Sequence, residues 1–142
     1  MKRILSVLIL SSGLLCAGDI EIENPWIRAV PPSSGATAAF MTIANHSDKL
    51  LTVTGGSTPV AREVKPMVTT KSRVNGQEVM GMEFVTSFTV EAEKKRVLEP
   101  GGDHIMLMKL KEVPKAGAVV PLTLEIESGG RKEKITLQIP VR

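Results

Sequence analysis

The sequence predicts an all-β protein, a β-sandwich or a barrel. Short runs in which apolar and polar residues alternate recur along the chain, and clusters of Pro, Gly, Asn and Asp separate them. No segment shows an apolar pattern long enough for a helix of ordinary length. The 142 residues correspond to about one domain, which we expect at residues 19–142.

The expected strands follow one another closely, and each ends where turn-forming residues begin. Asn24-Pro25 is expected to end the first strand, Gly55-Gly56 to start a turn after the fourth, and Asn75-Gly76 to close a hairpin. In the segment 36–44, Phe40 and Ile43 are candidates for the core. In chain order the expected strands are residues 20–23, 26–30, 36–44, 50–54, 60–67, 78–84, 88–90, 96–98, 104–110, 121–127 and 134–141.

Residues 1–18 have the layout of a secretory signal peptide. Lys2 and Arg3 precede an apolar run over residues 4–15, and small residues follow it. The apolar run is too short to cross a bilayer comfortably. In an alternative reading Cys16 is acylated, although Leu15 stands where a lipoprotein leader usually has a small residue. We therefore expect a periplasmic protein that has no stable membrane contact after cleavage.

The composition excludes several classes of function. Cys16 is the one cysteine of the chain, and cleavage of the leader would remove it. The mature protein is therefore not expected to have a disulfide, a thiolate zinc site or a cysteine nucleophile. Without Lys2 and Arg3 the balance is 16 basic against 15 acidic residues, a net +1, and aromatic residues make up 3%. These values argue against nucleic acid as a partner. No catalytic constellation of Ser, His and carboxylates can be placed, so we do not expect an enzyme.

Histidine and methionine carry the remaining chemistry. His46 lies in a polar Asn-His-Ser-Asp turn, where a solvated side chain is expected. His104 begins an expected strand, and Met106 shares its face because side chains two residues apart point the same way. An imidazole beside a thioether is a soft ligand pair that suits Cu(I). The alternative for the methionine is ordinary core packing.

Further methionines strengthen the copper hypothesis. Met80 and Met82 share one face of the expected strand 78–84, and Met67 lies just before that hairpin. Neutral ligands without a thiolate would leave the charge of the ion intact, which suits reversible holding better than storage.

The segment 99–110, Glu-Pro-Gly-Gly-Asp-His-Ile-Met-Leu-Met-Lys-Leu, resembles the hallmark of the periplasmic copper chaperones of the PCuAC (DUF461-like) family. In that family a Met precedes a His-x-Met motif by twenty-one intervening residues. Here residues 83–103 separate Met82 from His104, and Met106 completes the motif. Segments near both ends of the mature chain also resemble the family, at residues 25–32, 36–45 and 120–124.

The resemblance implies a cupredoxin-like or immunoglobulin-like β-sandwich that binds Cu(I) at an exposed Met/His site. It also implies delivery of copper to an acceptor protein of the respiratory copper pathway, for the assembly of cytochrome c oxidase. The ligands that match the family pattern are Met82, His104 and Met106.

The chain departs from the family at the first histidine. That residue should fall within residues 61–67, where Lys65 stands, and a protonated lysine is a poor metal ligand. Met67 is close enough in sequence to act as the fourth ligand, and Met80 is the other candidate. Because one imidazole ligand is absent, the binding of Cu(II) should be weakened more than the binding of Cu(I), so we expect a preference for Cu(I).

Two other hypotheses remain beside the Cu(I) carrier, which we expect to be a monomer. The chain could be a β-sandwich interaction module whose metal site is degenerate, since the first histidine is absent. The other hypothesis is an enzyme, but no catalytic set of residues can be placed in the sequence. Blue-copper electron transfer requires a cysteine ligand, and we do not expect it because the mature chain would have no cysteine.

Overall fold

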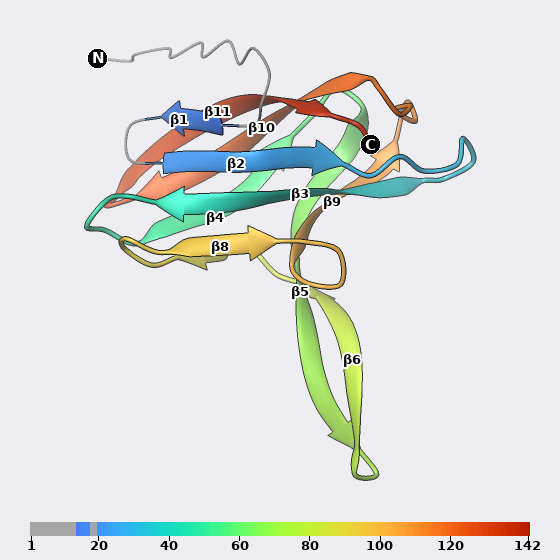
Figure 1. Ribbon diagram of the computed structural model, residues 1–142, viewed down its shortest axis with the longest axis horizontal. Coiled ribbons are helices and arrows are strands. Elements are labelled where there is room, and N and C mark those ends of the chain that lie inside the picture. Colours follow the sequence, from blue (N-terminus) through green and yellow to red (C-terminus); the bar gives the residue numbers. More distant parts are fainter. Residues whose placement is uncertain (1–13, 18–19) are drawn as a thin grey trace.

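The computed structural model describes the backbone of residues 14–17 and 20–142, and the side chains from residue 20 onward. Eleven strands and no helix are found in these residues (Figure 1). They are β1 (Leu14–Ala17), β2 (Ile20–Ile27), β3 (Ala36–Asn45), β4 (Leu51–Ser57), β5 (Ala61–Val74), β6 (Gln77–Phe84), β7 (Phe88–Val90), β8 (Lys95–Leu98), β9 (His104–Leu110), β10 (Val119–Ser128) and β11 (Arg131–Pro140).

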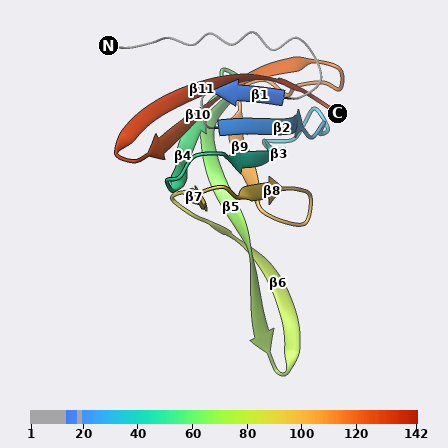
Figure 2. The same cartoon turned by 60° about the vertical axis from the view of Figure 1, so that its left-hand side comes forward.

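The strands form two sheets that pack face to face. One sheet has seven strands in the order β1-β2-β3-β9-β5-β6, with β8 also paired to β3. The other has four strands in the order β11-β10-β4-β7. Neighbouring strands within each sheet pair antiparallel (Figures 1 and 2). The prediction of an all-β sandwich is therefore confirmed.

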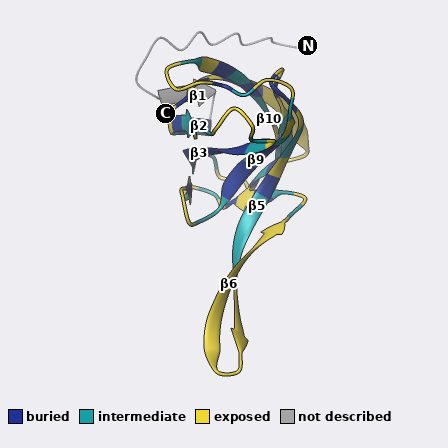
Figure 3. Ribbon diagram, turned by 90° about the vertical axis from the view of Figure 1, so that its right-hand side faces the viewer, coloured by how far each residue is buried: buried dark blue, intermediate teal, exposed yellow. Residues whose placement is uncertain are grey.

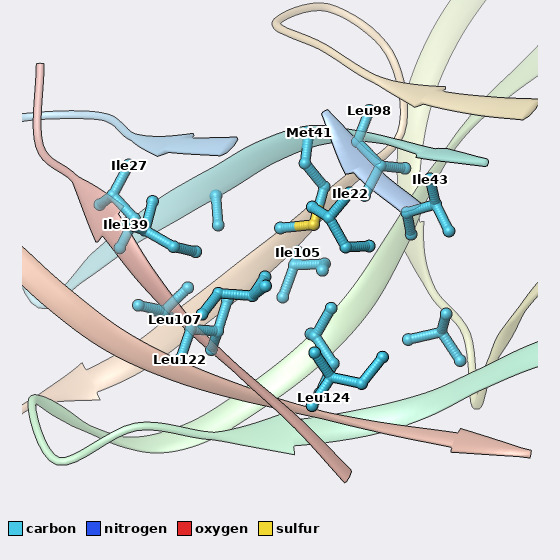
Figure 4. Packing of buried hydrophobic residues seen from close by; sticks show 14 of the residues in the cluster. Ile22, Ile27, Met41, Ile43, Leu98, Ile105, Leu107, Leu122, Leu124 and Ile139 are labelled. Carbon is cyan, nitrogen blue, oxygen red and sulfur yellow. The ribbon is translucent and has the colours of Figure 1, made fainter. Parts of the chain in front are cut away.

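The core lies between the two sheets and follows the alternation of each strand. Ile22 and Ile43 come from the seven-stranded sheet, and Leu122 and Leu124 come from the four-stranded sheet (Figure 4). In β9 the core residues are Ile105 and Leu107. Because neighbouring residues of a strand point to opposite faces, His104 and Met106 lie on the outer face of the seven-stranded sheet.

Two expected turns are instead parts of strands. Strand β2 continues through Asn24-Pro25, because a bulge between Glu23 and Trp26 absorbs the irregularity and Asn24 takes a positive φ of 49°. Strand β4 likewise continues through Gly56, where an added Cβ would lie 2.5 Å from the carbonyl oxygen of Thr123 on β10. Here glycine permits a close approach of two strands and does not make a turn.

The β5–β6 hairpin projects from the sandwich (Figures 1 and 3). Its turn is Asn75-Gly76, with φ of 52° and 76°, as expected for the Asn-Gly turn that the sequence predicts. The hairpin is longer than expected, since β5 extends to Val74. Every residue of β6 is exposed, and β6 pairs with β5 on one side only.

The predicted signal peptide falls largely outside the described residues. Residues 1–13 and 18 are not described, whereas residues 14–17 form β1 at the edge of the seven-stranded sheet. Cleavage after residue 18 stays a prediction. In the described part of the chain, no helix is long and apolar enough to cross a membrane.

Candidate metal centre

Strand pairing brings the candidate ligands to one face of the seven-stranded sheet. In β5 and β9, Met67 pairs directly with His104, and Lys65 pairs with Met106. Residues that are directly opposite in an antiparallel pair point to the same side. The β5–β6 register continues this face to Met82, which is opposite Thr69.

Met67 is the residue that links the other three. It lies directly opposite His104, and Met106 and Met82 occupy the two diagonal positions across β9 and β6. Diagonal neighbours have Cα atoms about 7–8 Å apart, which long side chains can bridge. The register therefore brings Met67, His104 and Met106 together. Met82 and Met106 lie on opposite sides of Met67, so a single ion held by both would lie above Met67, between them.

Met82 occupies the exposed part of the face. Met82 is 57% exposed. Its strand, β6, lies at the end of the sheet, and among the described strands it pairs with β5 alone. Met80 is equally exposed but lies one pair further toward the hairpin tip, opposite Lys71. Of the two, Met82 is therefore closer to the Met67–His104 pair.

His104 is held in one orientation. Its Nδ1 lies 3.0 Å from the carbonyl oxygen of Gly102, and a carbonyl oxygen only accepts, so Nδ1–H donates and the lone pair of the neutral ring is on Nε2. The ring packs 6.0 Å from the ring of Phe40, which in turn lies 4.7 Å from Trp26. Such an arrangement fixes the tautomer that a metal ligand needs.

The expectation of an exposed site is wrong for His104. This side chain is 5% exposed, since Phe40 covers one side of it on the outer face of the sheet. Met67 and Met106 are half-buried, and Met82 is exposed. An ion held by His104 would thus lie against the sheet, with access from the side of the hairpin.

Lys65 lies on the candidate face and does not turn away from it. Its Nζ is 5.9 Å from the centroid of the Phe84 ring, and Phe84 is the residue opposite Met67. A cation over an aromatic face at this distance is attracted to it. The ammonium group therefore lies beside Phe84, on the β6 side of the candidate face.

Asp103 does not orient His104, although it precedes it in sequence. Its carboxylate accepts a hydrogen bond of 2.7 Å from Nη2 of Arg96 and one of 3.1 Å from the backbone N–H of Thr69. Thr69 is the residue opposite Met82. Asp103 therefore connects the loop before His104 to the base of the hairpin.

Hard-metal chemistry has no comparable site in residues 20–142. These residues contain no cluster of three or more His, Cys, Asp or Glu side chains placed to hold a metal ion. His46, expected in a solvated turn, is exposed and pairs with Glu21 at 2.7 Å. A metal on the candidate face would therefore depend on thioethers.

The aromatic support of His104 is not among the features expected from the sequence. Phe40 is 2% exposed but lies on the outer face, whereas Ile43 lies in the core as expected. The positions of these two residues in the sequence indicate this difference. Residues 40 and 43 are an odd number of positions apart, so in a regular strand they point to opposite faces and cannot both point into the core. Phe84 lies next to the candidate site because β6 pairs with β5, and Asp103 contacts Thr69 across a turn. Neither contact can be predicted from a local pattern in the sequence.

A protein family and several solved structures are similar to this chain over most of its length. The family model described as "Putative lipoprotein LpqE-like" matches residues 20–141. A putative lipoprotein of Leifsonia xyli, Lxx21020, is 33% identical over 113 residues, which are 80% of this chain and 65% of that protein. The chain thus spans just under two thirds of the length of that curated relative.

Among solved structures, the Cu(I) form of DR1885 from Deinococcus radiodurans is 33% identical with a TM-score of 0.66, over 84% of this chain and 75% of that one. The copper-bound PCuAC domain of PmoF2 has a TM-score of 0.73 over 91% of this chain and 97% of that one, at 19% identity, and supports the fold alone. The match to the family model covers nearly all of the described chain, which therefore belongs to the LpqE-like family of putative lipoproteins.

Proposed function

We propose that this protein binds one Cu(I) ion at Met67, His104, Met106 and Met82 and carries it to an acceptor protein. The observation that supports this most is the β5–β9 register, which sets Met67 directly opposite His104 and diagonal to Met106. Three soft ligands from two neighbouring strands then share one face, and Met82 reaches the same face from the hairpin.

The chemistry of the ligand set favours Cu(I). Thioethers and a neutral imidazole are soft or intermediate donors, and Cu(I) is the biological ion that thioethers select. No thiolate takes part, so the ion keeps its positive charge and can leave by ligand exchange. Met67 supplies the fourth ligand in place of the histidine that is absent from residues 61–67.

The comparisons support copper as the cargo. DR1885, at 33% identity, has been solved in a Cu(I) form. A PCuAC domain with the same fold has been solved with copper bound. These relatives are binding domains, and we propose a non-enzymatic role for this chain as well.

Delivery requires that an acceptor reach the ion. Met82 is the exposed member of the set, so ligand exchange would start from the hairpin side while His104 still holds the ion. The acceptor that the PCuAC resemblance implies belongs to the assembly of cytochrome c oxidase. The leader and the lipoprotein relatives favour a location in the cell envelope, and we propose the periplasm after cleavage at residue 18, with acylation of Cys16 in place of that cleavage as the alternative.

A competition titration tests the proposal. The protein is titrated anaerobically with Cu(I) against a chromophoric chelator, beside Met67→Leu and His104→Ala. We expect one tight equivalent and at least a tenfold weaker affinity in both variants, because each loses a ligand. Met80→Leu is the matched control, since Met80 is as exposed as Met82 but lies further from His104, and it should bind like the wild type.

The alternative is an interaction module without a metal. The exposed edge strand β6, with Met80 and Phe84 uncovered, is the feature that favours it. A folded wild-type protein that does not compete for Cu(I) would contradict the carrier and favour this module.

A further inference from the structure

We propose that Lys65 makes the metal site selective for monovalent over divalent ions. This inference depends on the copper site proposed above and concerns the charge that the site accepts. A residue that cannot be a ligand while protonated would then contribute to specificity by repulsion.

The position of Lys65 is set by the strand pairing. It lies directly opposite Met106 and two residues before Met67 on the same face of β5. Its Nζ is 5.9 Å from the centre of the Phe84 ring, which belongs to the residue opposite Met67. The ammonium group therefore lies above the β5–β6 side of the proposed site.

The nearby carboxylates are engaged with other cations. Glu63, two residues before Lys65 on the same face, pairs with Nζ of Lys109 at 3.2 Å. Asp103, beside His104, pairs with Arg96 at 2.7 Å. In residues 20–142 no salt bridge involves Lys65. The proposed ligands are also neutral, and no described carboxylate forms a salt bridge with the Lys65 ammonium.

The charge of the ion then decides the size of the repulsion. Coulomb energy is proportional to the product of the two charges, so a divalent ion at a given place is repelled twice as strongly as a monovalent one. Because affinity depends exponentially on free energy, doubling the repulsion energy squares the factor by which the affinity is reduced. If Lys65 weakens a monovalent ion about threefold, it weakens a divalent ion about tenfold.

The experiment compares Lys65→Gln with the wild-type protein. Affinities are measured for Cu(I), for Ag(I) as a monovalent ion that is not easily oxidised, and for Cu(II). We expect Lys65→Gln to tighten Cu(I) and Ag(I) about threefold and Cu(II) about tenfold, with both gains smaller at high salt. Lys65→Arg keeps the charge and should retain the wild-type preference.

The control is Lys134→Gln, which removes the same charge from β11 in the other sheet and should leave all affinities unchanged. Equal gains for Cu(I) and Cu(II) in Lys65→Gln would overturn the inference, because steric hindrance does not depend on charge. No gain for any ion would overturn it as well. If the wild-type protein binds no Cu(I), the proposed function itself fails, which this series distinguishes from a failure at Lys65 alone.

Discussion

Replacing Asp103 with alanine should destabilise the protein and loosen the base of the β5–β6 hairpin. The carboxylate joins two elements, since it accepts from Nη2 of Arg96 at 2.7 Å and from the backbone N–H of Thr69 at 3.1 Å. Its side chain is 24% exposed and that of Arg96 is 28% exposed, so both bonds are only partly screened by solvent.

The size of the effect follows from these two bonds. A hydrogen bond between charged groups contributes about 1.5–3 kcal/mol when buried, and partial exposure lowers this to about 1–2 kcal/mol. Arg96 also keeps its bond to the carbonyl oxygen of Thr89, which limits the loss. The N–H of Thr69, left without its acceptor, adds about 1 kcal/mol. The total is about 2–3 kcal/mol, or a decrease in Tm of about 8–12 °C for a domain of this size.

Thermal unfolding followed by circular dichroism measures this decrease. Asp103→Asn is the matched control, because its amide oxygen can still accept from Thr69 while the ion pair with Arg96 is lost. It should lose about half as much stability. Cu(I) affinity should decrease about three- to tenfold in Asp103→Ala, since Met82 lies opposite Thr69, and change little in Asp103→Asn. An Asp103→Ala protein with wild-type Tm and copper affinity would refute this reasoning.

Two further predictions concern the scaffold. Gly56→Ala should cost about 1–3 kcal/mol in urea unfolding, because the new Cβ meets the carbonyl oxygen of Thr123 at 2.5 Å, whereas Gly35→Ala has no atom within 4 Å and should be neutral. Asn45→Ala should cost about 2–3 kcal/mol in the same assay, since Asn45 is 1% exposed and its Nδ2 donates to the carbonyl oxygen of Val90 at 3.0 Å. Wild-type midpoints for Gly56→Ala or Asn45→Ala would contradict these contacts.

Local patterns in the sequence predict the faces of the strands well. Alternation along β9 predicts that His104 and Met106 share one face, and in the structure Ile105 and Leu107 fill the core on the opposite face. Asn75-Gly76 predicts the hairpin turn because both residues tolerate a positive φ. Each of these features depends on residues that are adjacent in the chain.

Features that depend on distant residues could not be predicted in this way. Strand β9 lies between β3 and β5, and only this order sets Met67 opposite His104. The turn expected at Gly56 is a strand, because its glycine accommodates β10 from the other sheet. The burial of His104 likewise depends on Phe40 from β3. Sequence spacing could nominate these residues, but their neighbours come from the fold.

In the proposed site, Met67, Met82 and Met106 hold one ion together with His104. The most direct measurement is a carbon–proton NMR titration of the methionine methyl groups, labelled with carbon-13, as Cu(I) is added without oxygen. We expect the methyl signals of Met67, Met82 and Met106 to shift together and to stop shifting at one equivalent of Cu(I), while the signal of Met80 stays in place. A spectrum in which Met80 shifts and Met67 does not, or in which no methyl signal responds, would contradict it.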